Sequence, residues 1–281
     1  MRRCETHFLE CGCCRHPEVM TLAGGRLAPT EFPALSGLFL HPSEGAILYD
    51  TGYDSAFLAA TRAFPQRFYR WLTPPTLPVG ASAAEQLARF GLTPADVRWV
   101  VLSHFHADHI AGLHAFPAAR IACAKAGLAN ARCGSDWRAL SQGVLRALIP
   151  PDFAARAVYF EDLPRAPLPS AFAPFDEGAD IIGDGSLLAV ELPGHCPGHW
   201  GLAARGADDR LNLLAGDAAW SSRAIRENRP PPALTTAFLG ETEPYRRTLS
   251  RLHQLAAAAP EVLITPSHCA ERAAAIRAET P

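Results

Sequence analysis

The sequence predicts a mixed α/β fold in which sheets are covered by helices. Short apolar runs typical of strands alternate with segments of helical spacing in each half of the chain. Of the 281 residues, 48% are apolar, and no run rich in Ser, Gly, Gln or charge indicates a long disordered tail. Because no polar linker divides the sequence, we expect residues 1–281 to form a single domain.

Apolar runs and turn residues define the elements of the first half. Helix ends are indicated by Gly and by Pro next to Thr or Asp. The predicted strands are 36–49, as a pair joined by a turn at 42–45, then 99–102 and 121–124. The predicted helices are 81–90, followed by Gly91, a helix start at 93–96, and 136–148.

The second half is richer in strands. Short apolar runs separated by Gly, Asp and Pro alternate along it until one longer segment shows a helical period. The predicted strands are 179–182, 187–192, 201–204, 211–215 and 261–265, and the predicted helix is 243–258.

Two segments lack a clear place in this alternation. Residues 65–75 hold aromatic side chains between prolines, which suits a short helix or a lid near 64–75, or an ordinary packed surface excursion. Residues 150–176 have no clear period and are expected to be irregular beside a pocket. They belong to a second possible lid insertion near 126–176.

Charge and hydropathy exclude several classes of partner. With 26 Lys and Arg against 28 Asp and Glu, the net charge of −2 offers no basic surface for nucleic acid. No apolar stretch is long enough to span a bilayer, and the arginines near the start are not followed by an apolar signal sequence. We therefore expect a cytoplasmic protein that does not bind nucleic acid or membrane.

The eight cysteines are expected to be thiols. Cys11, Cys13 and Cys14 lie close enough together in sequence to bind a soft metal, but the paired two-residue spacing of a zinc knuckle is missing. Ordinary packed or exposed thiols are therefore favoured for this cluster.

The strongest chemical signal is the segment His104, His106, Asp108 and His109. These metal-competent side chains follow a predicted buried strand, where loops gather binding groups on a rigid support. In an extended segment His104 and His106 project to the same side, and a turn at Ala107 brings the next two toward the same point. Any single histidine is more often structural, but the cluster predicts a metal site.

Further donors follow other predicted strands. His195 lies in a loop of Gly and Pro and is the expected ligand there, while His199 is expected to orient that loop by hydrogen bonding. Asp217 ends a strand and could bridge two ions, although Asp is also favoured as a helix N-cap. His268 ends the last strand.

These motifs resemble the metallo-β-lactamase superfamily over nearly the whole chain. The matching segments are VLSHFHADHIAGL, PGHCPGHWG, AGDAAW and PSHC, and the early AILYDTGYD adds to the similarity to the lactonases that open acyl-homoserine lactones. The resemblance implies a four-layer αβ/βα sandwich, the metallo-β-lactamase fold, with the metal site at one edge between two similar halves.

The resemblance also implies a dinuclear zinc site, with manganese, iron or cobalt as alternatives. In this assignment His104, His106 and His195 hold one ion, Asp108, His109 and His268 hold the other, and Asp217 bridges them. Asp50 of the Asp-Thr-Gly turn is expected to support the ligand loop by hydrogen bonds, or to be a simple turn residue.

The implied reaction is hydrolysis of a carboxylic ester or lactone. A hydroxide bridging the two ions attacks the carbonyl, and Asp108 carries a proton to the leaving group. Trp220 is a departure, because acyl-homoserine lactonases have tyrosine three residues after the bridging Asp, and indole cannot titrate like a phenol. Trp220, Phe68 and Trp71 are candidate substrate contacts, although the aromatic segment also suits a homodimer contact or ordinary packing.

Other functions stay open at this point. A thioesterase of the glyoxalase II kind uses the same ligands, but the chain has no evident basic extension to hold glutathione carboxylates. A phosphodiesterase is disfavoured by the charge balance. From a different class, a non-catalytic module that binds metal or a partner would be expected to have lost ligands, whereas all the expected positions are filled. The expected partner is a small-molecule substrate.

Overall fold

The computed structural model describes residues 1–279 and contains two sheets joined through their common first strand. Strand β1 (Arg3–Pro17) pairs along most of its length with the antiparallel strand β2, while its first residues, Arg3 and Cys4, pair in parallel with β11. The continuous strand order is β7-β6-β5-β3-β2-β1-β11-β10-β9-β8, with β4 paired to β1, and β12 and β13 added beside β11. Strand β1 therefore ties the two halves of the chain together.

The first half places β3, β5, β6 and β7 side by side in parallel. Its elements after β1 are β2 (Pro29–His41), β3 (Gly45–Tyr49), α1 (Ser55–Ala60), α2 (Arg67–Leu72), β4 (Pro75–Thr76), α3 (Ala83–Gln86), β5 (Val97–Val101), α4 (Ala107–Ile110), β6 (Arg120–Cys123), α5 (Lys125–Arg132), α6 (Asp136–Ser141), α7 (Phe153–Arg156) and β7 (Ala157–Tyr159).

The second half is mostly antiparallel, except that β12 and β13 are parallel. Its elements are β8 (Arg165–Pro167), β9 (Glu177–Asp180), β10 (Leu187–Glu191), β11 (Trp200–Gly206), β12 (Leu211–Gly216), α8 (Ser222–Arg226), α9 (Ala233–Leu239), α10 (Thr242–Ala258), β13 (Val262–Pro266) and α11 (Ala270–Glu279).

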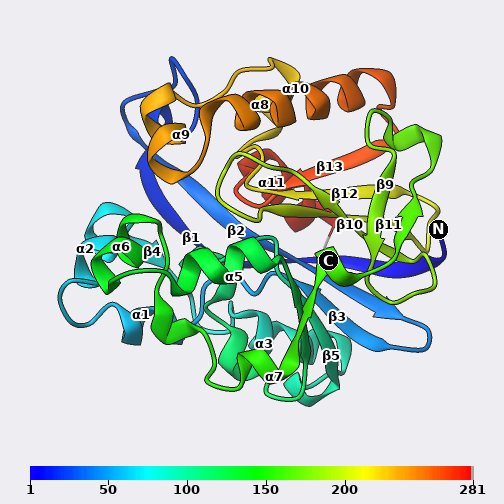
Figure 1. Cartoon of the computed structure of the whole chain (residues 1–281), viewed down its shortest axis with the longest axis horizontal. Helices are drawn as coiled ribbons and strands as arrows, with labels where there is room; N and C mark the ends of the chain where they lie inside the picture. Colours follow the sequence, from blue (N-terminus) through cyan, green and yellow to red (C-terminus); the bar gives the residue numbers. More distant parts are fainter. Residues whose placement is uncertain (280–281) are drawn as a thin grey trace.

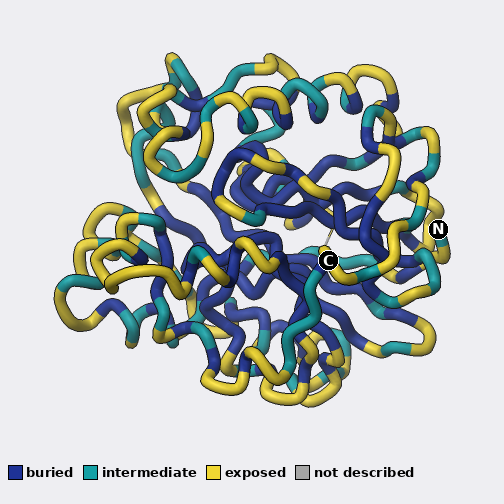
Figure 2. Tube along the Cα trace, in the orientation of Figure 1, coloured by how far each residue is buried: buried dark blue, intermediate teal, exposed yellow. Residues whose placement is uncertain are grey.

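Three large hydrophobic cores lie between four layers, and a small fourth cluster packs α11 against β2. One core lies between the sheets, where Ile47 and Trp99 of one sheet meet Trp200 and Leu202 of the other. A second core packs helices and loops against the outer face of the first sheet, and a third packs α10 against the second sheet (Figure 1). The central strands are buried while the outer helices carry the exposed residues (Figure 2). The predicted four-layer αβ/βα sandwich is confirmed.

Most predicted strands and helices are present, but the N-terminal region was not predicted. Strand β1 and the first part of β2 occupy residues for which the sequence pattern indicated no element. The pairing register of β1 with β2 shifts between Glu10 and Cys13, so a single two-residue period does not persist along the strand. Cys11, Cys13 and Cys14 lie on this strand and are buried free thiols.

The prediction of one helix over residues 136–148 was wrong. Helix α6 ends at Ser141 because Gly143 adopts φ +71°, and a separate 3-10 turn follows at Arg146–Leu148. Residues 64–75 contain α2, as the alternative of a short helix predicted. Residues 126–176 contain most of α5 together with α6, α7, β7 and β8, and these two strands pair with β6 and β9.

The strand directions gather the predicted site at one edge. Strands β3 and β5 are parallel and end just before Asp50 and Ser103. Strands β10 and β12 both run antiparallel to β11, and β13 is parallel to β12, so these three end at a common edge of their sheet. In the described part of the chain, no helix is both long and apolar enough to cross a membrane.

Candidate metal centre

The loop after β5 is held by backbone hydrogen bonds to two other segments of the chain. Trp200 donates to the carbonyl of Ser103 at 2.9 Å, and the amide of Ala107 donates to the carbonyl of Gly143 at 3.0 Å. Helix α4 begins at Ala107, with His106 as its extended N-cap residue. This loop is therefore anchored to the second sheet and to the turn after α6.

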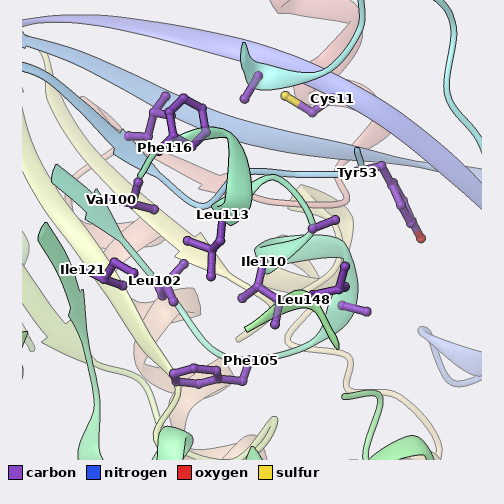
Figure 3. Packing of buried hydrophobic residues seen from close by; sticks show 14 of the residues in the cluster. Cys11, Tyr53, Val100, Leu102, Phe105, Ile110, Leu113, Phe116, Ile121 and Leu148 are labelled. Carbon is purple, nitrogen blue, oxygen red and sulfur yellow. The ribbon is translucent and has the colours of Figure 1, made fainter. Parts of the chain in front are cut away.

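Apolar residues alternate with the ligand candidates along this loop. Phe105 and Ile110 belong to the core on the outer face of the first sheet, where they lie among Leu102, Leu113 and Leu148 (Figure 3). Burial of these side chains is the driving force that fixes the loop. The histidines between them are thereby turned toward the second sheet.

The seven predicted ligands lie together, and all are buried. They form two groups with Asp217 between them. His195 Nε2 lies 3.0 Å from His106 Nδ1 and 3.3 Å from Asp217 Oδ2. On the other side, Asp217 Oδ1 lies 3.4 Å from His109 Nε2 and 3.3 Å from His268 Nε2. Each oxygen of this one carboxylate thus faces a different group of imidazoles.

Of the remaining candidates, His104 lies between the two groups, because its ligand atom is also within 4.8 Å of those of His109 and Asp217. The ligand atoms of His104, His106 and His195 all lie within 4.8 Å of one another, together with the sulfur of Cys196. The ligand atoms of Asp108, His109 and His268 form a second set within the same limit. His268 Nε2 is 3.4 Å from Asp108 Oδ2. The arrangement offers two adjacent places for a cation.

Several donor atoms at the centre have no internal partner. Among the described residues, His104 Nε2, His109 Nε2 and Asp217 Oδ1 are buried without a hydrogen bond. Buried polar atoms are almost always paired, so a cluster of unpaired ones is costly unless another group satisfies them. Imidazole nitrogens and carboxylate oxygens are the donors that zinc and related ions bind. The residues present therefore fit a pair of divalent cations.

Three of the histidines are oriented by hydrogen bonds through Nδ1. His104 Nδ1 lies 2.8 Å from Ser103 Oγ, and His109 Nδ1 lies 2.8 Å from Asp50 Oδ2. His268 Nδ1 donates to the carbonyl of Pro33 at 2.7 Å. Because each Nδ1 is engaged, Nε2 is the nitrogen that faces the centre. His106 differs, since its Nε2 lies against Gly143 and its Nδ1 faces His195.

Asp50 connects the end of β3 with the ligand loop. Besides His109 Nδ1, its carboxylate accepts hydrogen bonds from the Ser103 amide at 2.8 Å and the Ser103 hydroxyl at 2.7 Å. Asp50 itself adopts φ +57°, a conformation that is uncommon for residues other than Gly. A side chain held in this way by three hydrogen bonds supports both His109 and the backbone before His104.

His199 lies beside the centre but uses both ring nitrogens elsewhere. Its Nδ1 donates to the carbonyl of Leu192 at 3.0 Å, and its Nε2 accepts from the amide of Asp217 at 2.9 Å. Gly216 leaves the space for this contact, since a Cβ there would lie 2.7 Å from His199 Nε2. His199 thus fixes the position of Asp217 and has no nitrogen left for a cation.

The three candidate substrate contacts lie in two places. Trp220 is buried and its Nε1 donates to Asp217 Oδ2 at 2.7 Å, with its ring edge-on to His195. Phe68 and Trp71 lie on α2 with exposed fractions of 42% and 59%, and their rings contact each other at 5.6 Å. The ring centroid of Phe68 also lies 6.1 Å from that of Trp137 in α6, the helix that ends just before Gly143. No hydrogen bond or ring contact joins this aromatic cluster to the seven ligands within residues 1–279.

The pKa values of the two groups of imidazoles are shifted in opposite directions. Burial lowers the pKa of His104 and His195 well below the usual value and that of His106 to about 4, so these rings are neutral. Burial would also lower the pKa of His109 and His268, but Asp217 and neighbouring carboxylates outweigh it and raise both. Protons therefore compete with cations mainly at the second group.

Asp217 is held as a carboxylate. Burial opposes its ionisation, but the positive charges of His268 and His109 outweigh burial and keep its pKa well below the usual range. An ionised, enclosed carboxylate between two sets of imidazoles is suited to neutralise part of the charge of two cations.

Sequence reasoning missed some side chains near the centre. Cys196 follows a predicted ligand directly, but only the fold brings its sulfur to the first group. Tyr69 of α2 is close enough to Asp108 and Asp217 for their charges to add to the effect of burial and raise its phenol pKa. Pro33 lies on a strand that the sequence pattern did not indicate.

Comparison with known proteins identifies a matching family model and several similar proteins. Residues 29–268 match the model of the "Metallo-beta-lactamase superfamily". The N-acyl homoserine lactonase AttM of Agrobacterium fabrum is 30% identical over 182 residues, which are 65% of this chain and 62% of that protein. AttM of Rhizobium johnstonii is 28% identical over 237 residues, 83% of this chain and 80% of the relative. The chain thus spans less than two thirds of the first of these relatives.

Solved structures share the whole fold. An N-acyl homoserine lactone hydrolase with the product N-hexanoyl-L-homoserine at its catalytic metal centre superposes with a TM-score of 0.74 at 19% identity, covering 98% of this chain and 97% of that one. AidC, a dizinc quorum-quenching lactonase, superposes with a TM-score of 0.61 at 16% identity, covering 94% and 87%. At these identities the likeness establishes the fold.

Proposed function

The chain belongs to the metallo-beta-lactamase superfamily, and from that premise we propose that it is a dinuclear metal-dependent hydrolase that opens lactones, with acyl-homoserine lactones as the substrate class. The observation that carries the proposal is Asp217, whose two carboxylate oxygens face two separate sets of donors at 3.3 to 3.4 Å. The lactonase names of the relatives support the choice of a lactone over a thioester.

In this proposal His104, His106 and His195 hold one cation, and Asp108, His109 and His268 hold the other, with Asp217 shared. Zinc is the proposed metal, because imidazole and carboxylate donors suit it and the AidC structure is named as dizinc. When bound, two such cations would polarise the substrate carbonyl and lower the pKa of a bound water molecule toward neutrality, so that it could act as a nucleophile.

The protein's own residues supply position and a proton. Asp108 is more accessible than Asp217, with side-chain exposed fractions of 11% and 5%. Its carboxylate is therefore the one proposed to carry a proton to the leaving alkoxide. Asp50, Ser103 and His199 keep the ligands in place through the hydrogen bonds described above.

Trp220 affects how the substrate carbonyl could be polarised. Its N–H donates to Asp217 Oδ2, so this donor orients the shared carboxylate instead of standing free for the substrate. Polarisation of the lactone carbonyl would then depend on the cations more than on a side-chain hydroxyl. We propose that Trp220 is a positioning residue beside the substrate.

Phe68 and Trp71 are proposed to contact the acyl chain. Each methylene buried against them is worth about 0.8 kcal/mol. In the Phe68→Ala and Trp71→Ala variants, the KM for a long acyl chain should therefore rise more than the KM for a short one. Val79→Ala is the matched control, because Val79 is fully exposed and touches none of these rings. Equal effects on long and short chains would remove this part of the proposal.

The experiment that tests the function is a substrate panel on zinc-loaded protein. Acid release is followed with acyl-homoserine lactones, a simple aryl ester, a thioester and a phosphodiester. His106→Ala should lose more than about 100-fold in lactone turnover, because losing a ligand costs more than the about 10–100-fold loss caused by removing an outer partner. His114→Ala, an exposed histidine in the same segment, is the matched control and should keep its rate. A preference for the phosphodiester, or no lactone opening, would refute the proposal.

A further inference from the structure

Cys196 is a thiol at the first group of imidazoles. It follows His195 in the loop between β10 and β11, and the residue is only 8% exposed. Its sulfur and the ligand atoms of His104, His106 and His195 all lie within 4.8 Å of one another. The four side chains therefore converge on one place, which the reaction proposed above fills with three nitrogens and a carboxylate oxygen only.

The Cys196 thiol has no other evident role in the fold. Within the described residues it is free of any disulfide, and its sulfur makes no hydrogen bond. Two other buried thiols do have partners: Cys11 donates to the carbonyl of Leu9 at 3.8 Å, and Cys269 accepts from the Ser222 amide at 3.2 Å. A buried, unpaired sulfur among three imidazoles is thus an unused donor.

The Asp217 oxygen that faces this group already has other partners. Asp217 Oδ2 already accepts the indole N–H of Trp220 at 2.7 Å and faces His195 at 3.3 Å. A carboxylate oxygen with a short hydrogen bond has less negative charge to offer a cation. A thiolate beside this oxygen would supply that charge, and imidazole nitrogen and thiolate sulfur are both donors that zinc binds in proteins.

We propose that Cys196 is a fifth protein donor, beside the shared Asp217, to the cation held by His104, His106 and His195, and that it gives this position a preference for zinc over manganese. The inference rests on the proposed metal centre, but not on its substrate. On coordination the S–H bond is replaced by a sulfur–metal bond, and the proton passes to bulk water. Soft thiolate ligands favour zinc, whereas manganese prefers oxygen donors.

Cobalt spectroscopy on the full chain tests the assignment. Metal-free protein is loaded with Co²⁺, cobalt content is measured by elemental analysis, and the near-ultraviolet sulfur-to-cobalt charge-transfer absorption is recorded. Wild type should show this absorption, and Cys196→Ser should lose it while still taking up cobalt at the second group. Cys123→Ala is the matched control, because it removes a fully buried thiol of β6 and should leave the absorption unchanged.

Two further measurements extend the test, and the first of them needs no variant. Zinc X-ray absorption of the wild type should contain a sulfur at about 2.3 Å. The zinc-over-manganese preference should fall by more than about tenfold in Cys196→Ser, since a ligand outweighs an outer partner.

The outcomes separate this inference from the proposed function. Cobalt-loaded wild type without the absorption, or an absorption that persists in Cys196→Ser, overturns the role of Cys196. Failure to bind cobalt overturns it as well. Lactone turnover is measured on the same samples, so turnover without the absorption refutes only the sulfur ligand. The absorption without turnover refutes only the proposed reaction.

Discussion

Replacing Asp50 with Asn tests how the second group of imidazoles is held. The carboxylate of Asp50 accepts from His109 Nδ1, the Ser103 amide and the Ser103 hydroxyl, at 2.7 to 2.8 Å. An Asn side chain keeps one acceptor oxygen, but its NH₂ group is a donor and would face groups of Ser103 or His109 that are donors themselves. We therefore expect one of the three buried hydrogen bonds to be lost if the NH₂ group takes the place of Oδ1, and two if it takes the place of Oδ2. In either case His109 loses its charged acceptor and should be less firmly oriented.

The size of the effect follows from these contacts. A hydrogen bond to a charged group contributes about 1.5–3 kcal/mol, so the free energy of unfolding of metal-free protein should fall by about that amount. Affinity for the second zinc should fall by about 10–100-fold, as for other outer partners of a metal-bound histidine. Loss of the Asp50 charge also lowers the pKa of His109 and weakens proton competition. Asp217 contributes more to that pKa than Asp50, so the loss of orientation should dominate.

The assay is zinc competition against a chromophoric chelator, with thermal or denaturant unfolding alongside. Asp180→Asn is the matched control, because Asp180 is also buried and accepts two amides, from Gly183 and Gly185, at 2.9 Å. The control should lose stability and keep both zinc affinities. If Asp50→Asn bound its second zinc within about twofold of wild type, the supporting role of Asp50 would be refuted.

Three further predictions concern the same centre. Gly143→Ala combines a strained φ of +71° with a Cβ 2.9 Å from His106 Cδ2, so the zinc affinity of the first group should fall at least about tenfold. Gly134 has the same φ, but a Cβ there would meet only the flexible side chain of Arg138. Gly134→Ala should therefore leave the zinc affinity unchanged. Trp220→Phe removes the N–H that orients Asp217 and should lower kcat by about tenfold with both zinc ions retained, and an unchanged kcat would contradict that role. Because the pKa values of His109 and His268 are raised, their charged forms stabilise metal-free protein fully below about pH 6.5, and this stabilisation is lost as pH rises through the raised pKa values. The zinc affinity of the second group should therefore increase over the same pH range. A zinc affinity that does not change with pH would contradict this prediction.

The fold class and the clustering of the predicted ligands could be anticipated because their signals are local. His104 to His109 follow a continuous apolar strand, and the other predicted ligands follow strands of the same kind. A strand end places its next residue at the sheet edge, whatever the rest of the chain does. This is why motifs far apart in sequence met in one centre.

The parts that could not be predicted depend on contacts between distant segments. Strand β1 belongs to both sheets and shifts register at its cysteines, so its burial has no single period. The Pro33 carbonyl that orients His268 is 235 residues away in sequence. Gly143 ends a predicted helix because its positive φ is compatible with the turn against His106, a contact that no local pattern reveals. Cys196 is likewise a donor only by its place in the folded loop.

The most direct test of the account is a zinc titration of the lactonase reaction. Metal-free protein is mixed with an acyl-homoserine lactone, and acid release is measured in a pH-stat as zinc is added. We predict that acid release appears as zinc binds and reaches its plateau at two equivalents, with no plateau at that ratio for Asp217→Ala. Full acid release without any metal, or none at two bound equivalents, would contradict it.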